Sequence, residues 1–415
     1  MLELFPDTAR IDGGALTIGG LSAAELVRAH GSPLIVYDEA TLRARARAYR
    51  AAAPGAFIAY GAKAFPNVAI MRLLAGEGIG ADVSTRGELE LALAAGITGD
   101  RLVVHGNNKS DDELDAAARA GAVVVLDSLE EIERARTAGV TRMLVRVTPG
   151  IEADTHEAIR TGHHGSKFGL SPDDALEALR RAPELEGLHV HIGSQLHDLV
   201  AARRAVESVT AFAGRSRDEL GWTLRTVDLG GGLGVASLPG EGELSIELFV
   251  AALLEELERA VAGHGLSRPK VILEPGRSLT GRAGVTLYTV GSVKRAGDGT
   301  TFVAVDGGMS DNPRRALYGA AYTALLANRA DEQPSSTVTV VGKHCESGDV
   351  LIDAVELPEA RRGDLLAIPA TGAYTLSMSS NYNALPRPAA VLVAAGSTRL
   401  IRRRETIDDL LALEA

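Results

Sequence analysis

The feature that most constrains the fold is a regular alternation of short apolar runs with helical segments. Eight apolar runs occupy residues 57–62, 79–83, 101–105, 122–126, 142–147, 187–192, 226–229 and 270–273. The segments between them, such as 68–74 and 88–93, repeat apolar residues at helical spacing. Apolar strands joined by helices indicate a parallel sheet covered on both faces. Eight units predict an α/β fold with a (β/α)8 TIM-type barrel, and a doubly wound sheet is the alternative.

Polar residues or glycines follow nearly every run on its C-terminal side. They are Lys63, Asp82, His105, Asp127, Arg146, His191, Gly230 to Gly232, and Glu274. In a barrel these ends converge on one face, where active sites lie. Lys63 alone would be interpreted as a lysine that reaches solvent at a strand end. The convergence makes it a candidate functional residue instead.

The alternation stops near residue 280. Residues 284–294, 301–305, 337–341, 350–352, 365–368 and 389–393 read as strands divided by turn residues. A helical pattern is scarce there except near 317–329. We therefore predict a barrel domain over 31–280 and an antiparallel β domain built from 1–30 plus 281–415.

Composition excludes several functions. Asp and Glu number 54 against 43 Lys and Arg, a formal charge of −11, which argues against a nucleic-acid or anionic-membrane surface. Aromatic residues make up only 4% of the chain, too few for base-stacking platforms. The single cysteine, Cys345, fits a reducing compartment. With no apparent signal peptide or membrane span, we expect a cytoplasmic protein.

Two glycine-containing motifs follow predicted strands. The stretch Gly230-Gly-Gly-Leu-Gly234 could wrap an anion, most often phosphate, with its backbone N–H groups, although a plain tight turn is the alternative. The stretch Glu274-Pro-Gly-Arg277 combines a carboxylate with an arginine. That pair suits a partner for a ring nitrogen beside a phosphate or carboxylate anchor.

The remaining candidates are histidines, the cysteine and a tyrosine. His189 and His191 alternate on one strand face, so a metal pair with Asp82 or His105 is one interpretation. We favour His191 stacked on a flat ring and expect no metal. Cys345 has polar neighbours, which favours a functional thiol over a structural one. Tyr374 follows a glycine turn and could donate a hydrogen bond to phosphate.

A lysine, a ring-nitrogen carboxylate, a glycine loop and a flat-ring stacker together indicate a pyridoxal 5'-phosphate site. The chain also resembles the fold-type III pyridoxal-phosphate decarboxylases and, within them, the diaminopimelate decarboxylase family, from about Pro33 onward. The motifs that carry the resemblance are Tyr60-Gly-Ala-Lys-Ala64, His105-Gly-Asn-Asn-Lys-Ser110, His191-Ile-Gly-Ser-Gln195, Gly230-Gly-Gly-Leu-Gly234, Glu274-Pro-Gly-Arg277, Cys345-Glu-Ser-Gly-Asp349 and Ser380-Asn-Tyr-Asn383.

The resemblance implies an alanine-racemase-like barrel, a β domain and a role for each matched residue. Lys63 matches the Schiff-base lysine, His191 the ring stacker, Glu274 the ring-nitrogen partner, and Cys345 the proton donor. Cofactor contacts are expected from Lys63, Asp82, His191, Ser194, Gly230, Gly231, Gly232, Glu274, Gly276, Arg277 and Tyr374. Substrate contacts are expected from Arg277, Arg314, Tyr318, Glu346 and Tyr374. The resemblance further implies a homodimer whose two subunits share each active site.

The implied reaction is decarboxylation of meso-2,6-diaminopimelate to L-lysine and CO2. Arg277 and Arg314 suit a distal carboxylate and Glu346 a distal ammonium. Alternatives are a decarboxylase for another basic amino acid or a conjugated intermediate, a cofactor-bound regulator without activity, and a racemase. Three positions depart from the family pattern, namely Arg86, Arg315 and His344. The two arginines would add charge near the site and bear on recognition of the substrate's far end.

Overall fold

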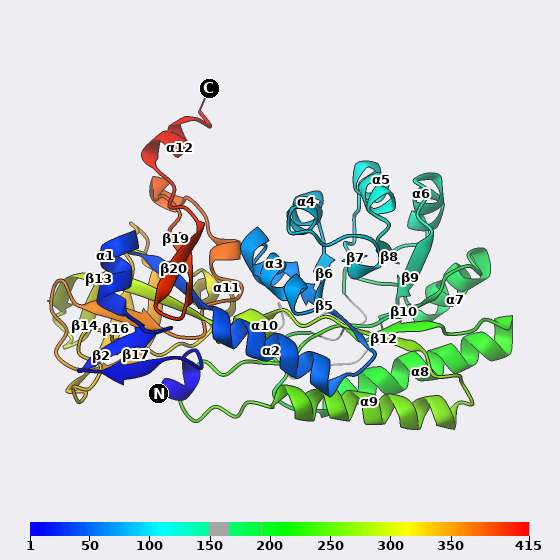
Figure 1. The fold of residues 1–415 in the computed structure, drawn as a ribbon, viewed down its shortest axis with the longest axis horizontal. Helices are drawn as coiled ribbons and strands as arrows, with labels where there is room; N and C mark the ends of the chain where they lie inside the picture. Colours follow the sequence, from blue (N-terminus) through cyan, green and yellow to red (C-terminus); the bar gives the residue numbers. More distant parts are fainter. Residues whose placement is uncertain (149–165, 192, 415) are drawn as a thin grey trace. The chain divides into compact units, whose positions relative to one another are not determined.

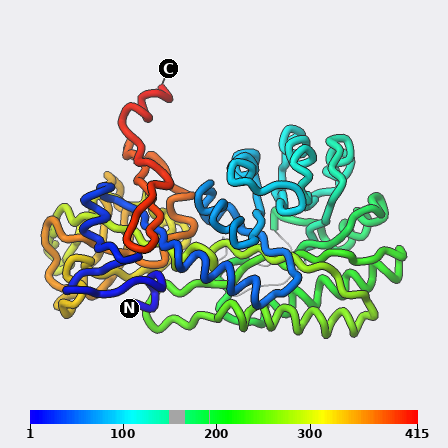
Figure 2. Tube along the Cα trace, viewed as in Figure 1, coloured from blue at the N-terminus to red at the C-terminus, as the bar shows by residue number. Residues whose placement is uncertain are grey.

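The computed structural model describes residues 1–148, 166–191 and 193–414. It divides into two compact units (Figure 1). The barrel unit consists of Arg45–Gly234 and Glu243–Ser278, and the sheet unit consists of Met1–Ala44, Val235–Gly242 and Leu279–Ala415. Figure 2 shows the first and last segments of the chain, in dark blue and red, within the same unit. Residue 192, which ends the sixth predicted run, lies outside the described residues.

Eight parallel strands close the barrel, as predicted. They are β5 (Phe57–Gly61), β6 (Gly80–Val83), β7 (Leu102–Val104), β8 (Val123–Leu126), β9 (Arg142–Arg146), β10 (Gly187–His189), β11 (Thr226–Asp228) and β12 (Lys270–Leu273). Neighbours in the barrel are neighbours in sequence, and β12 pairs with β5 to complete the ring. The eight apolar runs and the TIM-type fold class are therefore confirmed.

Apolar side chains from several barrel strands pack together in one cluster. Ala59, Val103, Val123 and Leu144 lie in one buried cluster, and Phe57 packs against it. At Gly80 a Cβ atom would lie 2.4 Å from the Phe57 ring. Only glycine fits there, because the ring already occupies that space.

Helices cover the outside of the barrel (Figure 1). They are α3 (Val68–Gly76), α4 (Arg86–Ala94), α5 (Asp111–Ala120), α6 (Glu131–Thr137), α7 (Pro172–Arg181), α8 (Val200–Leu220) and α9 (Ile246–Gly263). Short polar side chains start several of them. Ser110 caps α5 in a capping box with Glu113, and Asn67 accepts two backbone hydrogen bonds at the start of α3. None of the helices in the described part of the chain has the length and apolarity that a bilayer crossing requires.

The sheet unit contains a large mixed sheet and a small antiparallel one. The strands of the large sheet are β4 (Leu34–Asp38), β13 (Gly284–Arg295), β14 (Thr301–Val305), β15 (Leu325–Leu326), β16 (Ser336–Val341), β17 (Val350–Leu357), β18 (Leu365–Ile368), β19 (Ala389–Ala394) and β20 (Ser397–Arg402). Most pairs are antiparallel, but β14 pairs with β16 and β19 pairs with β4 in parallel. The small sheet joins β1 (Arg10–Asp12), β2 (Ala15–Ile18) and β3 (Leu21–Ser22).

The large sheet is buried on both faces along β13. Val285 and Leu287 belong to one apolar cluster, whereas Tyr288 and Val290 belong to another. The alternation of side chains along a strand places these pairs on opposite faces. Three helices, α1 (Ala23–His30), α11 (Arg314–Tyr318) and α12 (Ile407–Leu411), also belong to this unit.

Two details differ from the sequence-based expectations. Residues 31–44 and 235–242 lie in the sheet unit, whereas the predicted barrel domain covered 31–280. Within the first of these segments, β4 pairs with β13 and β19. The helical pattern near 317–329 yields only α11, since Gly319 adopts a left-handed conformation with φ of 62° and ends the helix. A strand, β15, follows instead. Helix α2 (Glu39–Ala52) crosses the boundary between the units.

Candidate active site

The carboxyl ends of the barrel strands bring ionisable side chains to one level. His189 at the end of β10 is in register with Arg146 of β9 and with Asp228 of β11. Asp82 of β6 is in register with Gly61 of β5, two residues before Lys63. The four residues Asp82, Arg146, His189 and Asp228 are buried, whereas Lys63 is exposed. The predicted convergence of strand ends is therefore present in the barrel unit.

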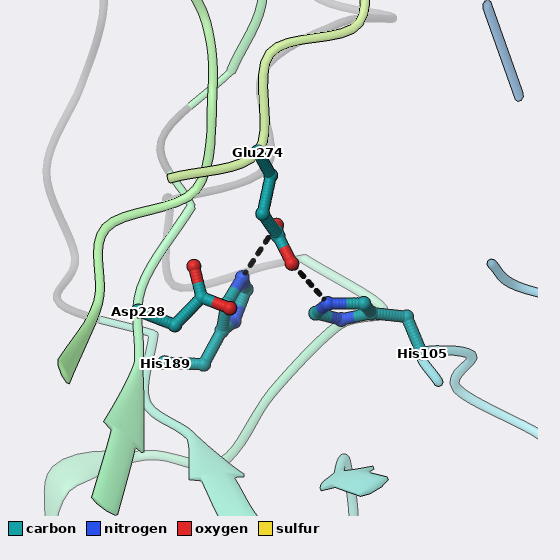
Figure 3. A group of neighbouring side chains, drawn as sticks. All are labelled: His105, His189, Asp228 and Glu274. Carbon is teal, nitrogen blue, oxygen red and sulfur yellow. Dashed lines mark hydrogen bonds and ion pairs between the residues drawn. The ribbon is translucent and has the colours of Figure 1, made fainter. Parts of the chain in front are cut away.

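Glu274 lies at the centre of this group, between two histidine rings (Figure 3). Its Oε1 lies 2.6 Å from Nε2 of His105, and its Oε2 lies 3.4 Å from Nε2 of His189. Burial raises the pKa of Glu274, but the charge and hydrogen bond of His105 and the close approach of the His189 ring outweigh it. The net pKa lies well below the ordinary value, so Glu274 is a carboxylate at neutral pH.

The pKa shifts of three neighbouring groups, Asp228, Asp82 and His189, favour their neutral forms. Burial, and then the charge of Glu274, raise the pKa of Asp228 well above its ordinary value, and the same two causes raise that of Asp82. Burial lowers the pKa of His189 to about 3, so its ring is neutral at neutral pH. One buried carboxylate is thus kept ionised while the groups around it favour their neutral forms. This arrangement is typical of functional sites.

Lys63 and His191 adjoin the group. Lys63 occupies a short 3-10 turn, Ala62–Ala64, directly after β5, and its side chain is exposed between two buried alanines. Burial, followed by the charges of Lys63 and Arg146, lowers the pKa of His191 well below its usual range. A neutral, flat imidazole suits stacking on a conjugated ring better than an imidazolium does.

The glycine loop after β11 packs closely against its neighbours. At Gly231 a Cβ atom would lie 2.3 Å from the carbonyl oxygen of Glu274, and at Gly230 it would lie 2.5 Å from Nδ1 of His191. Gly230 N–H donates to Oδ1 of Asp228 at 2.9 Å, which fixes the turn. Leu196 N–H donates to the carbonyl of Gly232, so the loop that carries Ser194 lies beside it.

These features fit pyridoxal phosphate. The glycines form a cradle that side chains would fill, and glycine-rich backbone binds phosphate. Oδ1 of Asp82 and Oδ2 of Asp228 are buried without a hydrogen-bond partner among the described residues, as expected beside a polar ligand. A lysine and an ionised carboxylate complete the requirements of such a cofactor.

The same side chains could in principle hold a metal ion. The ligand atoms of His105, His189, Asp228 and Glu274 all lie within 4.8 Å of one another. Two ligands of one zinc ion, each about 2 Å from it, lie roughly 3 Å or more apart. The 2.6 Å contact between His105 and Glu274 is instead a hydrogen-bond distance. The geometry favours a hydrogen-bonded network.

The sheet unit contains a second group of predicted residues. The Arg314 guanidinium is buried and lies 5.4 Å from the ring centre of Tyr318 and 6.0 Å from that of Tyr374. Tyr374 has φ of 58°, a strained value for a bulky residue and one that occurs at functional sites. These three side chains therefore form a compact cluster with a fixed cation.

The loop that carries Cys345 and Glu346 is fastened by one buried carboxylate. Asp349 accepts hydrogen bonds from the backbone N–H of His344 at 2.8 Å and of Met309 at 2.6 Å. The ring of His344 lies 2.9 Å from the hydroxyl of Ser310. Both Cys345 and Glu346 are exposed on this fixed loop. The thiol and the carboxylate are thus accessible on a rigid support.

Comparison with known proteins identifies the family. The family described as "Pyridoxal-dependent decarboxylase, pyridoxal binding domain" matches residues 39–281. A diaminopimelate decarboxylase of Actinosynnema pretiosum subsp. auranticum is 45% identical over 99% of this chain and 95% of that protein. The chain belongs to the diaminopimelate decarboxylase family. The solved diaminopimelate decarboxylase of M. jannaschii in complex with L-lysine is 33% identical, with a TM-score of 0.92 over 99% of this chain and 98% of that one.

Two departures from the diaminopimelate decarboxylase pattern are surface ion pairs. Arg86 pairs with Glu90 within α4, and Arg315 pairs with Asp353. Each guanidinium is therefore neutralised by a carboxylate of its own unit. The third departure, His344, makes the hydrogen bond to Ser310 described above.

Sequence reasoning left several residues of this family member without a role. His105 enters that reasoning as a strand end, a possible metal ligand and the start of a motif, Asp349 as the end of the Cys345 motif, and Asp228 does not enter it. The contacts of His105 and Asp349 join residues far apart in the chain. His105 and Glu274 are separated by 169 positions. The one feature of the sequence that points to these residues is their position at strand ends and at the borders of motifs.

Proposed function

We propose that this chain decarboxylates meso-2,6-diaminopimelate to L-lysine and CO2 with pyridoxal 5'-phosphate as cofactor. The observation that carries the proposal is the buried Glu274 carboxylate, kept ionised by His105 and His189 at the carboxyl end of the barrel. The substrate is inferred from relatives named diaminopimelate decarboxylase that match nearly the whole chain.

The barrel residues would hold the cofactor. We assign Lys63 to its carbonyl carbon, Glu274 to its ring nitrogen and His191 to its ring face. The phosphate would be held by the Gly230 to Gly232 loop, Ser194, Gly276 and Arg277, with Asp82 close to the ring. Bound pyridoxal phosphate would supply an electron sink, which accepts the electron pair of the carbon–carboxylate bond when CO2 leaves.

The chain's own groups then select the substrate and move a proton. Arg314 suits the substrate's distal carboxylate, because a guanidinium binds a carboxylate in a forked geometry. Tyr318 and Tyr374 lie near Arg314 and would line the same region. Glu346 suits the distal ammonium. We assign Cys345 as the general acid that donates the proton replacing the lost carboxylate.

We further propose a homodimer in which Cys345 and Glu346 serve the partner subunit's cofactor. The exposure of both side chains supports this role. Lys63→Ala and Cys345→Ala, each inactive alone, should regain about a quarter of wild-type activity after unfolding, equal mixing and refolding. Half of the dimers would be mixed, and half of their sites intact. Proven subunit exchange without recovery would contradict the shared site.

Because its one cysteine is a free thiol, we propose that the enzyme acts in a reducing compartment, the cytoplasm.

The reaction is tested by CO2 release from four amino acids. We expect kcat/KM for meso-diaminopimelate to exceed the values for lysine, ornithine and arginine by at least about 100-fold. A guanidinium left without its carboxylate partner costs that much. Higher efficiency with ornithine or arginine would identify a different decarboxylase. Cofactor binding without any CO2 release would favour a regulator, and proton exchange at the substrate carbon without CO2 would favour a racemase.

A further inference from the structure

His105 has a role in the site beyond its position at the end of a barrel strand. Its Nε2 is 2.6 Å from Glu274, the shortest of the contacts described above for that carboxylate, and its ring is buried. We propose that His105 is a positioning residue that orients Glu274 and keeps it ionised. The inference rests on the proposed function, because Glu274 matters there as the partner of the cofactor's ring nitrogen.

The backbone on both sides of His105 is held firmly. Its N–H donates to the carbonyl of Val83 on the neighbouring strand at 2.8 Å. Gly106, the next residue, has φ of 125°, which favours glycine. A Cβ there would lie 3.3 Å from both the Ser84 carbonyl and the side chain of Lys109. The loop therefore turns away from the strand in a single, closely packed conformation.

Lys109 anchors the other end of this loop. It is 2% exposed, and its ammonium contacts Glu131 at 2.8 Å, the carbonyl of Gly106 at 2.6 Å and the carbonyl of Val125 at 2.8 Å. A buried ammonium is tolerated only when its donors are satisfied in this way. Ser110 then caps α5. The motif from His105 to Ser110 thus consists of an anchored loop that presents one ring to Glu274.

The ring is also fixed by its other neighbours. Oδ1 of Asp82 lies 3.7 Å from His105 Nε2, and the His189 ring packs against it edge-on, with centroids 4.7 Å apart. His105 cannot swing away from Glu274 without disturbing both contacts. The hydrogen bond favours the carboxylate form of Glu274, and the fixed ring leaves that carboxylate one orientation. The ionisable groups that surround this pair are Lys63, Asp82, Arg146, His189 and Asp228.

Three substitutions of His105 that differ in side-chain length and in hydrogen-bonding capacity test the inference. His105→Gln keeps an N–H donor near the position of Nε2, His105→Asn offers the same amide with shorter reach, and His105→Ala removes the donor. His264→Gln is the matched control, because His264 is exposed at the end of α9. We expect kcat to fall about 10- to 100-fold in His105→Ala and His105→Asn, with KM changed by less than about threefold. His105→Gln should recover most of the loss, and the control should match wild type.

A double-mutant cycle separates action through Glu274 from general disruption. If His105 acts through Glu274, the variant His105→Ala/Glu274→Gln should be no slower than Glu274→Gln, within about threefold. A second readout needs no substrate. The pH midpoint of the bound cofactor's visible absorption should shift in the same direction in His105→Ala and Glu274→Gln, and no further in the double variant.

The outcomes discriminate clearly. Multiplicative losses in the double variant, a wild-type kcat in His105→Ala, or an unmoved absorption midpoint would overturn the inference. If His105→Ala does not fold, the difference between the Gln and Asn variants decides. A wild-type enzyme that binds cofactor but releases no CO2 from diaminopimelate would refute the proposed function alone, because the absorption cycle would still test His105.

Discussion

Asp311 is a buried carboxyl whose ionisation should limit stability at alkaline pH. It lies in the loop that leads to Arg314 and is 4% exposed. Oδ1 accepts a hydrogen bond from Gly308 N–H at 2.7 Å, whereas Oδ2 has no hydrogen-bond partner among the described residues. Burial, with a smaller contribution from Asp306, raises its pKa from 3.8 to about 7. We predict that Asp311→Asn stabilises the protein at pH 8.

The magnitude follows from the two pKa values. A carboxyl with a raised folded pKa contributes stability that is complete below its unfolded pKa and is lost as pH rises through the folded pKa. The difference between 3.8 and about 7 corresponds to about 4 kcal/mol of unfolding free energy lost by pH 8. At pH 4.5 only about 1 kcal/mol is lost, because this pH lies less than one unit above the unfolded pKa of 3.8. Asparagine does not titrate and keeps the acceptor for Gly308.

The assay is the melting temperature of both proteins between pH 4.5 and 8. The unfolding entropy of a 415-residue chain is about 0.9 kcal/mol/K, so the difference of about 3 kcal/mol should raise the Tm of Asp311→Asn relative to wild type by about 3 to 4 °C across this range. Asp12→Asn, at an exposed position of the same unit, is the control and should show no such trend. A Tm difference between Asp311→Asn and wild type that does not grow with pH would refute the reasoning.

Three further substitutions probe the assigned roles. Lys63→Ala should lose the visible absorption of lysine-bound cofactor and essentially all turnover, and a variant that retains both would exclude Lys63 from this role. Glu274→Gln should lower kcat about 100-fold or more while cofactor affinity, measured by absorbance titration, changes far less. Unchanged turnover would show that Glu274 is not the partner of the cofactor's ring nitrogen. Arg314→Ala should raise KM for diaminopimelate about 10- to 100-fold in steady-state assays. An unchanged KM would remove Arg314 from substrate recognition.

The barrel could be predicted because its signals are local. Each strand is a short apolar run, and each ends in a polar residue that the fold carries to one face. Helix α1 also begins at a local signal, because Ser22 and Glu25 form a capping box at its first turn. The candidate residues at strand ends followed directly from this regularity.

Other features depend on tertiary contacts that no local pattern encodes. The strand Leu34–Asp38 is buried throughout and apolar up to Asp38, so its sequence fits a barrel as well as the sheet that contains it. The pattern near 317–329 resembles a helix until the left-handed turn at Gly319 stops it. The link between His105 and Glu274 joins the ends of β7 and β12, and only the closed barrel brings them together.

The most direct test of the account is the stoichiometry of a single reaction. Wild-type enzyme, loaded with pyridoxal phosphate and given meso-diaminopimelate alone, should release one CO2 for each L-lysine formed, and Lys63→Ala should form neither. Lysine formation that persists in Lys63→Ala, or loss of diaminopimelate without equal amounts of CO2 and lysine, would contradict the central claim.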